Sequence, residues 1–223
     1  MSLAKAVLSL FVAGLFSKLI GVSYRVPLSY ILGAEGIGLY QMAYPAFTVA
    51  AIVAAGGLPL AMAKFIAEHM AMGRKESAWL VFQVGRFLLW LQGIMLGIAF
   101  YMLAPVVAEK VLGDPRSELA LKALAPAVFL LCVEGSLRGY FQGRQNYGVL
   151  AKAQAFEQLC RVGTMLVLAS LLLPYGLEYA AAGAAAGATG GALGAVIFLR
   201  LYFPAREAAK CRPGLKEWYE LAH

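Results

Sequence analysis

Long apolar stretches alternate with short charged segments along the whole chain. Three stretches contain no Asp, Glu, Lys or Arg: residues 36–63, 87–108 and 179–199. Three further stretches, 6–31, 119–142 and 153–173, are apolar apart from isolated charges. A bilayer core of ~30 Å is crossed by about 20 helical residues, so each stretch is long enough to span it. The pattern therefore predicts about six membrane-spanning segments.

These segments are expected to be helices. A strand barrel needs alternating segments of about ten residues, which the chain lacks, and backbone groups in hydrocarbon must satisfy their own hydrogen bonds. We predict an all-α polytopic membrane bundle within residues 1–204. Its spans are expected at roughly 6–31, 42–64, 83–105, 119–142, 153–173 and 179–203. The remaining segment, 205–223, combines basic residues with Trp218 and is expected to be a cytoplasmic interfacial tail or linker.

Composition supports a membrane protein over a soluble enzyme. Hydrophobic residues make up 61% of the chain and charged residues 14%, whereas soluble domains carry about a quarter charged residues. The start of the chain resembles a signal peptide, but Lys18 and Arg25 follow within the same element. No small-residue cleavage site precedes polar sequence there, so we expect a first membrane helix that is not cleaved.

Lys and Arg residues predict the orientation. With the N-terminus in the cytoplasm, the loops near 64–86, 138–161 and 200–223 are cytoplasmic. They and their helix ends contain Lys64, Arg74, Lys75, Arg86, Arg138, Arg144, Lys152, Arg161, Arg200, Arg206, Lys210, Arg212 and Lys216. The opposite side contains only Lys110, Arg116 and Lys122, so the positive-inside rule places both termini in the cytoplasm. The net charge of +7 then follows from topology and contact with anionic lipids, and needs no nucleic acid.

Glycine and proline residues mark the expected turns and one break. The glycine-rich segment 33–38 is expected to close the first hairpin, and Pro45 is expected near a helix end. Gly56, Gly57 and Pro59 instead fall inside the second span, where a proline removes a backbone hydrogen bond. We expect a kink or break there, acting either as a hinge or as a packed irregularity.

The most informative residues are charges inside predicted spans, because such residues usually face the bundle interior or a water-filled cavity. Lys18 and Arg25 are seven residues apart, which places them on one face of a helix. Two later spans each carry a Glu–Arg pair at a spacing of four, which also shares a face. These pairs, and the polar residues that extend the second, are Glu134, Arg138, Gln154, Glu157, Arg161 and Thr164.

Two interpretations of these charges stay open. Each Glu–Arg pair could neutralise itself and tie helices together, because functional and structural ion pairs look alike in a sequence. Lys18 and Arg25 have no acidic partner in their own helix. For these two cations we favour a cavity that binds an anionic ligand, because a buried unpaired cation is costly.

Other chemistry finds little support. Gly183, Gly187 and the glycines up to Gly194 lie inside the last span without a following Gly-Lys-Ser/Thr, so we expect close helix packing and no phosphate loop. The chain has one Asp, Asp114, and two histidines, which leaves aspartyl dyads, His-based triads and metal sites without their groups. We expect no enzyme, no metal site and no cofactor.

Several blocks resemble a known family. YRVPL at 24–28 and LGAEGIGLYQMAYP at 32–45 resemble the start of stage V sporulation protein B-like polysaccharide biosynthesis proteins. GLPLA at 57–61 is similar to that family's second-helix break, and RGYFQG at 138–143 with the residues from Glu157 to Val162 resembles its fourth-to-fifth-helix signature. The family belongs to the multidrug/oligosaccharidyl-lipid/polysaccharide exporter superfamily.

The resemblance implies one lobe of a two-lobe transporter. Relatives flip undecaprenyl-diphosphate-linked oligosaccharides or cell-wall precursors across the bacterial cytoplasmic membrane by alternating access. First-helix cations bind the diphosphate in related lipid II flippases, and the matching residues here are Arg25 and Lys18. Glu134, Arg138, Gln154, Glu157 and Arg161 are then expected to line the cavity or form a gate.

The family's chains are about twice this length. A second lobe, supplied by a partner subunit or by self-association, is therefore an expected partner besides the lipid-linked saccharide and membrane lipids. A cation-coupled multidrug exporter lobe and a non-transporting membrane subunit or fragment are the alternatives. Such exporters favour acidic cavity residues, whereas the cations of the first span favour an anionic substrate.

Overall fold

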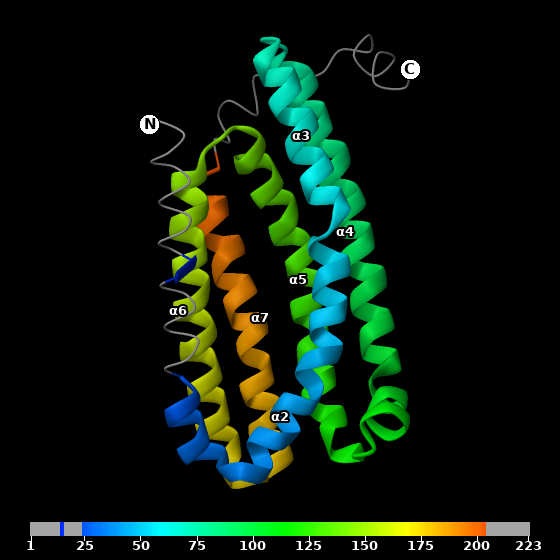
Figure 1. Ribbon diagram of the computed structural model, residues 1–223, viewed down its shortest axis with the longest axis vertical. Coiled ribbons are helices and arrows are strands. Elements are labelled where there is room, and N and C mark those ends of the chain that lie inside the picture. The colour runs from blue at the N-terminus through cyan, green and yellow to red at the C-terminus, as the bar shows by residue number, and fades with distance from the viewer. Residues whose placement is uncertain (1–13, 16–23, 204–223) are drawn as a thin grey trace.

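A computed structural model describes residues 14–15 and 24–203 of the chain, and in this part it is built of helices. Figure 1 shows the long helices running along the longest axis of the molecule. The elements are α2 (Arg25–Ala55), α3 (Gly57–Ala71), α4 (Lys75–Val106), the π-helix η1 (Val107–Leu112), the 3₁₀ helix η2 (Pro115–Ser117), α5 (Glu118–Gly143), α6 (Tyr147–Leu172), the 3₁₀ helix η3 (Leu173–Tyr175) and α7 (Leu177–Leu201). Most of the first predicted span, and all of the segment 205–223, lie outside the described residues.

Five helical segments of the described chain are long and apolar enough to cross a membrane. They are Arg25–Ala71, Lys75–Leu112, Pro115–Gly143, Tyr147–Tyr175 and Leu177–Leu201. Their lipid-side surface carries large apolar side chains, such as Phe87, Met95 and Met102 of α4, which are 64–71% exposed. Such a surface would aggregate in water but is solvated by lipid tails in a bilayer. The prediction of an all-α membrane bundle is confirmed.

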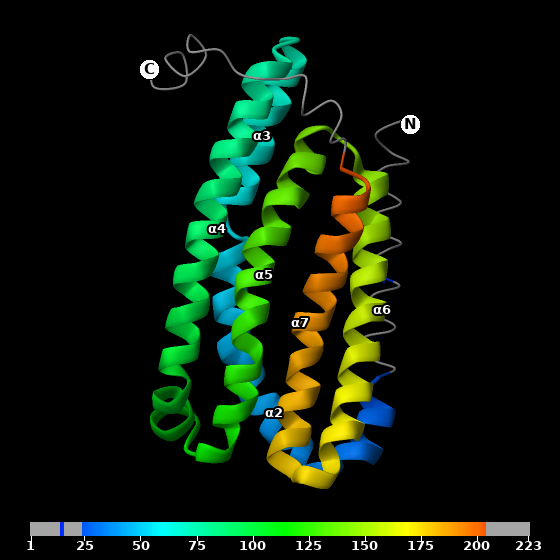
Figure 2. The ribbon, with the colours of Figure 1, turned by 180° about the vertical axis from the view of Figure 1, so that it is seen from behind.

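The two ends of the bundle differ in charge. The α3–α4 turn, the α5–α6 turn and the end of α7 lie together at the upper end in Figures 1 and 2. Basic residues outnumber acidic ones there: Lys64, Arg74, Lys75, Arg144, Lys152 and Arg200 against Glu68 and Glu76. The α4–α5 and α6–α7 connections lie at the opposite end, where acidic residues outnumber basic ones: Glu35, Glu109, Asp114, Glu118 and Glu178 against Lys110, Arg116 and Lys122. We refer to these as the basic end and the acidic end.

The first turn is sharper than the sequence predicted. Residues 34–38 are helical, and the only non-helical residue inside α2 is Gly33, with φ 64° and ψ −175°. A residue without Cβ adopts this conformation without strain, so one glycine reverses the chain between two helical pieces. The early helical start also places Pro45 inside α2, which makes its prediction at a helix end wrong. Figure 1 shows the short first piece of α2 at the acidic end.

The second span is broken near Pro59, as its glycines and proline predicted. Helix α2 ends at Ala55 and α3 begins at Gly57, with Gly56 non-helical (φ −70°, ψ −124°). A broken helix leaves backbone carbonyls without their intrahelical partners. The side-chain amide of Gln92 on α4 donates a hydrogen bond to the carbonyl of Val53, at 3.0 Å. This bond satisfies a carbonyl that the break would otherwise leave bare in hydrocarbon.

Helices α5 and α7 form the centre of the bundle. Both bury most of their length, α7 through small residues that include Ala180, Ala184 and Ala188. A Cβ added at Gly187 would lie 2.6 Å from Cβ of Met165 on α6, and one at Gly183 would lie 2.7 Å from the carbonyl oxygen of Leu168. Only glycine permits this approach, so the predicted packing role of the glycine run is confirmed.

Candidate functional site

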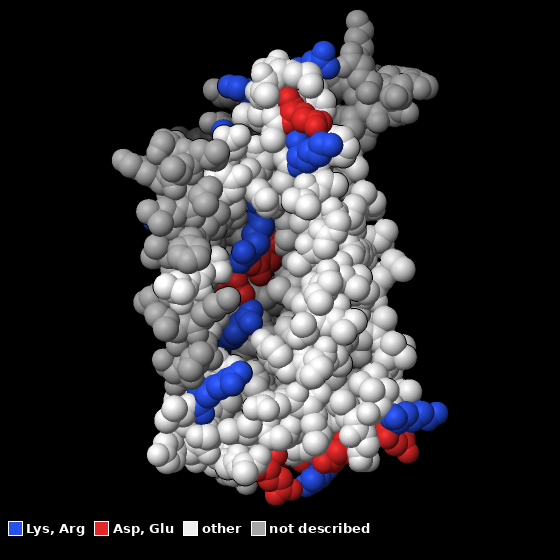
Figure 3. All heavy atoms as spheres, in the orientation of Figure 1, with Lys and Arg blue, Asp and Glu red and all other residues white. Residues whose placement is uncertain are grey.

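A cavity of about 300 Å³ opens between α5 and α6 and faces the end of α2. Figure 3 shows a hollow in which positive and negative side chains gather, with uncharged surface along its right side. Its lining residues are Ala55, Leu131, Glu134, Gly135, Arg138, Gln154, Glu157 and Gln158. Four of these, Glu134, Arg138, Gln154 and Glu157, are residues that the sequence predicted for the site.

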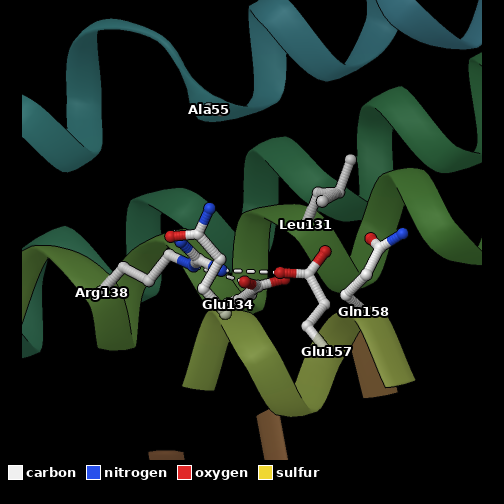
Figure 4. Close-up of a pocket in the computed structure, with 8 residues that line it drawn as sticks. Ala55, Leu131, Glu134, Arg138, Glu157 and Gln158 are labelled. Atoms are coloured by element: carbon white, nitrogen blue, oxygen red, sulfur yellow. Dashed lines mark hydrogen bonds and ion pairs between the residues drawn. The ribbon is translucent and has the colours of Figure 1, made fainter. Parts of the chain in front are cut away.

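Arg138 joins the two helices that wall the cavity. Its Nε bonds to Glu134 Oε1 one turn earlier on α5, and its Nη2 donates to Glu157 Oε2 of α6 at 2.7 Å. Figure 4 shows the three side chains pointing toward one another from the two helices. The planar guanidinium presents several donors in fixed directions, which allows one arginine to bridge two carboxylates.

Arg161 extends the network along α6. Its Nη2 donates to Glu157 Oε1 at 2.5 Å, so Glu157 accepts from two arginines through its two oxygens. The other terminal nitrogen, Nη1, lies 3.5 Å from the hydroxyl of Tyr44 on α2. The four charged residues Glu134, Arg138, Glu157 and Arg161, which we call the cavity quartet, thereby connect three helices.

The cavity quartet lies deep in the bundle. Arg161 is 14 residues from Tyr147 at the start of α6 and 11 from Leu172 at its end. At about 1.5 Å per residue, its backbone lies ~21 Å and ~17 Å from those ends. Charges at this depth are costly unless they pair with one another or line a water-filled cavity. All four residues of the cavity quartet are paired, and Glu134, Arg138 and Glu157 also line the cavity.

Glu134 is the most enclosed member of the cavity quartet. The residue is 2% exposed, and its Oε2 is buried without a hydrogen-bond partner. The side chain of Glu157 is 13% exposed and that of Arg138 33%. Burial of a carboxylate costs free energy unless it is paired and hydrogen-bonded. Glu134 therefore depends on Arg138 for compensation of its charge.

Close contacts of α3 with α5 and of α7 with α6 hold the helices that carry the quartet. Pro59 of α3 packs against α5 beside Glu134 and Arg138: a Cβ at Gly135 would lie 3.1 Å from its Cγ, and one at Gly139 2.8 Å from its carbonyl oxygen. On the other wall, a Cβ at Gly191 of α7 would lie 2.8 Å from Cβ of Arg161. The broken span and the small-residue helix thus both position charged side chains.

The remaining predicted residues have different surroundings. Lys18 lies outside the described residues. Arg25 is exposed in the first turn of α2 and is not among the residues lining the cavity, and it forms no ion pair with any residue that the structure describes. Gln154 lines the cavity, and its Nε2 would lie 3.8 Å from a Cβ at Gly14. Thr164 instead packs against Gly190 of α7.

Sequence reasoning missed three neighbours of the quartet. Gln158 directly follows Glu157 and could have been added to the polar face of α6 from its amide alone. Tyr44 lies in a stretch without charges, so no pattern distinguished it from the other aromatic residues of α2. Leu131 contributes an apolar wall, for which a membrane sequence gives no signal.

A metal site has no ligand set in the described part of the chain. No group of three or more His, Cys, Asp or Glu side chains comes together there. Glu134 and Glu157 are the two carboxylates lining the cavity, and each is already paired with arginine. The chemistry available at this site is therefore ion pairing and hydrogen bonding.

This arrangement, a helical membrane bundle with an ion-paired cavity, is of the kind found in membrane transporters. The chain belongs to the polysaccharide biosynthesis protein family, which matches residues 3–222. The resemblance inferred from the sequence blocks is therefore confirmed.

Two curated proteins of Bacillus subtilis are similar in sequence to this chain. The chain is 36% identical to stage V sporulation protein B of Bacillus subtilis over 93% of its own length and 40% of that protein. It is 27% identical to the lipid II flippase MurJ of the same organism, over 86% of the chain and 38% of MurJ. The chain thus spans about 40% of the length of these relatives.

Solved structures confirm the fold. An outward-facing multidrug resistance MATE transporter of the MOP superfamily matches with a TM-score of 0.71 at 17% identity, covering 96% of this chain and 49% of that one. A second MOP superfamily transporter, from Pyrococcus furiosus, matches with the same TM-score at 15% identity. The relatives with a stated activity are flippases and transporters, which agrees with the expectation that the chain is not an enzyme.

Proposed function

We propose that the chain is one lobe of a flippase that moves undecaprenyl-diphosphate-linked oligosaccharide or a cell-wall precursor across the bacterial cytoplasmic membrane by alternating access. The observation that carries the proposal is the cavity quartet, in which Arg138 lines an open cavity and Arg161 pairs with the lining residue Glu157. Arginine is well suited to bind diphosphate, because its guanidinium matches phosphate oxygens with paired hydrogen bonds.

The size of the cavity supports binding of the headgroup within this lobe. Ligand pockets commonly measure about 300–1,000 Å³, so a cavity of about 300 Å³ is at the lower limit. It can hold a diphosphate, whereas an oligosaccharide needs more room than this volume provides. We propose that a second lobe, from a partner subunit or a second copy, forms the opposite wall and encloses the sugar.

Arg25 and Lys18 are proposed as further cations on the substrate path. Arg25 is eight residues before the Gly33 turn, which is about 12 Å of helix from that end of the bundle. A cation at that depth, without an acidic partner in the described residues, favours contact with an anionic ligand or headgroup. With the basic end in the cytoplasm, Arg25 lies on the outer side of the quartet and meets the diphosphate later in the cycle.

The break between α2 and α3 is proposed as the hinge. Gly56, Gly57 and Pro59 interrupt the helix, and Pro59 contacts the α5 face that carries Glu134 and Arg138. A change of the angle between α2 and α3 at Gly56 would therefore move Pro59 against the part of α5 that carries the quartet residues. Hinges in transporters are a few residues at the ends of helical elements that absorb such changes.

Binding of farnesyl diphosphate to the purified chain in nanodiscs tests the proposal, with farnesol as the neutral control ligand. Arg138→Lys should weaken diphosphate binding about tenfold, because lysine keeps the charge but loses the paired hydrogen bonds that a guanidinium makes with phosphate oxygens. Arg200→Lys, at the end of α7, is the matched control and should bind normally. Equal binding of farnesol and farnesyl diphosphate, or normal binding by Arg138→Lys, would contradict the proposal.

A multidrug exporter lobe is the second candidate, favoured by the two carboxylates Glu134 and Glu157 in the cavity. Such a protein would bind a lipophilic cation in preference to an anion. Tetraphenylphosphonium in the same assay distinguishes the two functions. Tight binding of this cation, lost in Glu157→Gln, would favour the exporter over the flippase.

A further inference from the structure

The cavity quartet is electrically neutral. Glu134 and Glu157 carry two negative charges, Arg138 and Arg161 two positive charges, and every arginine is paired with a glutamate. An incoming anion therefore finds no free cation among these residues. It can bind Arg138 or Arg161 only by taking the place of a carboxylate, which is then left in a low-dielectric cavity without its partner.

Glu157 and Glu134 would keep different numbers of partners if an anion displaced one of them from an arginine. Glu157 accepts from both arginines and its side chain is 13% exposed, so it keeps one partner when the other is drawn away. Glu134 is 2% exposed, and within residues 14–15 and 24–203 it pairs with Arg138 alone and has one buried oxygen, Oε2, without a partner. Loss of Arg138 would leave Glu134 as an isolated buried charge. Such groups become neutral by binding a proton.

Resting on the proposed function, we infer that binding of a diphosphate to this cavity is coupled to the uptake of one proton by Glu134. The diphosphate pairs with the guanidinium of Arg138, and the displaced carboxylate of Glu134 gains a proton from the solvent. One O–H bond forms on Glu134, and the buffer supplies the proton. The cavity with its ligand thereby carries one negative charge less than it would if Glu134 stayed ionised.

Among the described groups, the second cation that acts on Glu134 is Arg161, and Glu157 already pairs with it. On its own helix the facing charge is Arg138, and α6 contributes Glu157 and Arg161. From α2 the ionisable neighbours of the quartet are Tyr44 and Tyr40. α3 meets this part of α5 through Pro59. On α4, Arg86 lies with Ser136 and Leu137 at a separate crevice, together with Arg200 of α7.

Calorimetric titration of the full chain with farnesyl diphosphate, in buffers of different ionisation enthalpy, measures the protons taken up. The wild-type chain should take up about one proton more than Glu134→Gln, and its affinity relative to that variant should fall about tenfold per unit rise in pH. Comparison of the two proteins removes the ligand's own protonation. Glu178→Gln, at the acidic end of α7, is the matched control and should behave as wild type.

Each result has a definite meaning. Binding without proton uptake by the wild-type chain would overturn this inference alone and leave the proposed function standing. Proton uptake that persists in Glu134→Gln but disappears in Glu157→Gln would overturn the assignment to Glu134. Absence of diphosphate binding to every protein would overturn the proposed function, and this inference with it. Where Glu134→Gln misfolds, farnesyl sulfate, which does not titrate near neutral pH, gives the wild-type proton count without a variant, and binding of it without proton uptake would overturn the inference.

Discussion

An arginine between two carboxylates occurs twice in the described chain, once in the cavity and once at the acidic end. Arg138 bridges Glu134 and Glu157 at membrane depth, while Arg116 bridges Glu35 and Asp114, with contacts of 2.6 Å and 3.0 Å. Each bridge also joins distant parts of the chain, α5 to α6 in the cavity and the early part of α2 to η2 at the end. The pattern of hydrogen bonds and ion pairs alone therefore does not distinguish the two bridges.

Exposure separates the two bridges. The carboxylate side chains of the exposed bridge, Glu35 and Asp114, are 63% and 20% exposed, whereas those of the cavity bridge, Glu134 and Glu157, are 3% and 13% exposed. The two arginines differ less, with Arg116 47% and Arg138 33% exposed. Exposed pairs are screened by solvent and salt and contribute little. A buried pair adds little as a whole, but removal of one partner leaves an uncompensated charge. Similar bridges should therefore respond very differently to the same substitution.

Arg138→Gln should have the largest effect on stability. It leaves Glu134 buried without a cation, and such a loss costs about 3–5 kcal/mol in folded proteins. We expect about 3 kcal/mol here, since water in the cavity can reach part of the site. Thermal unfolding of the purified chain in mild detergent measures it.

Arg138→Lys provides the control for that experiment. It keeps the charge but cannot bridge two carboxylates with a planar fork, so its stability should lie between the wild type and Arg138→Gln. An Arg138→Gln protein that unfolds at the wild-type temperature would show that Glu134 needs no cation. The distinction between the two bridges would then fail.

Gly191→Ala should have an intermediate effect on stability. It tests whether the packing of α7 against α6 holds the Glu134–Arg138–Glu157 bridge in place. The added Cβ would lie 2.8 Å from Cβ of Arg161 and 3.1 Å from its Nε, so α6 must shift away from α7. Overpacking of this kind costs about 1–3 kcal/mol. We expect lower thermal stability together with weaker diphosphate binding, because Arg161 and Glu157 move with α6.

Gly163→Ala is the matched control for this substitution. Gly163 is on α6, two residues after Arg161, and nothing lies within 4 Å of its Cβ position, so the change should not lower stability. Equal stability of the Gly191 and Gly163 variants would show that the contact with α7 is not needed to hold the quartet.

The sequence predicted each half of the cavity bridge but not the bridge itself. A spacing of four within one helix placed Glu134 with Arg138 and Glu157 with Arg161, because helix geometry fixes that relation. The pairing of Arg138 with Glu157 depends on the rotation of α5 against α6. That rotation is set by contacts between helices, such as the packing of Gly191 of α7 against Arg161 of α6. The spacing of residues along one helix does not predict such contacts.

The sequence carries less information on where a helix begins than on where an apolar stretch is long enough to span a membrane. Charge-free stretches predict spans, because the bilayer imposes length and polarity on them. The same rule carries no information about where a helix begins outside the hydrocarbon. A single glycine at Gly33 makes the first turn, so α2 starts early and Pro45 becomes internal.

Arg116→Gln should have the smallest effect, and its pH dependence completes the comparison. Hydrogen bonds from the side chain and backbone of Arg116 hold the pKa of Asp114 below its ordinary value. A lowered pKa means that the ionised carboxylate stabilises the folded chain above the ordinary Asp pKa, and that this contribution disappears as the pH falls through the lowered value. The variant should therefore differ from the wild type at neutral pH and match it in acid.

Thermal unfolding against pH and salt measures this small difference. Added salt should remove it at neutral pH, because both partners of the Arg116–Glu35 pair are exposed. The shift from Arg138→Gln should persist in the same salt, since the low-dielectric cavity screens its charges less. A salt-resistant loss of stability in Arg116→Gln, as large as that of Arg138→Gln, would mean that the contact between α2 and η2 closes the acidic end. The exposed fraction of the side chains would then not predict how much each arginine contributes to stability.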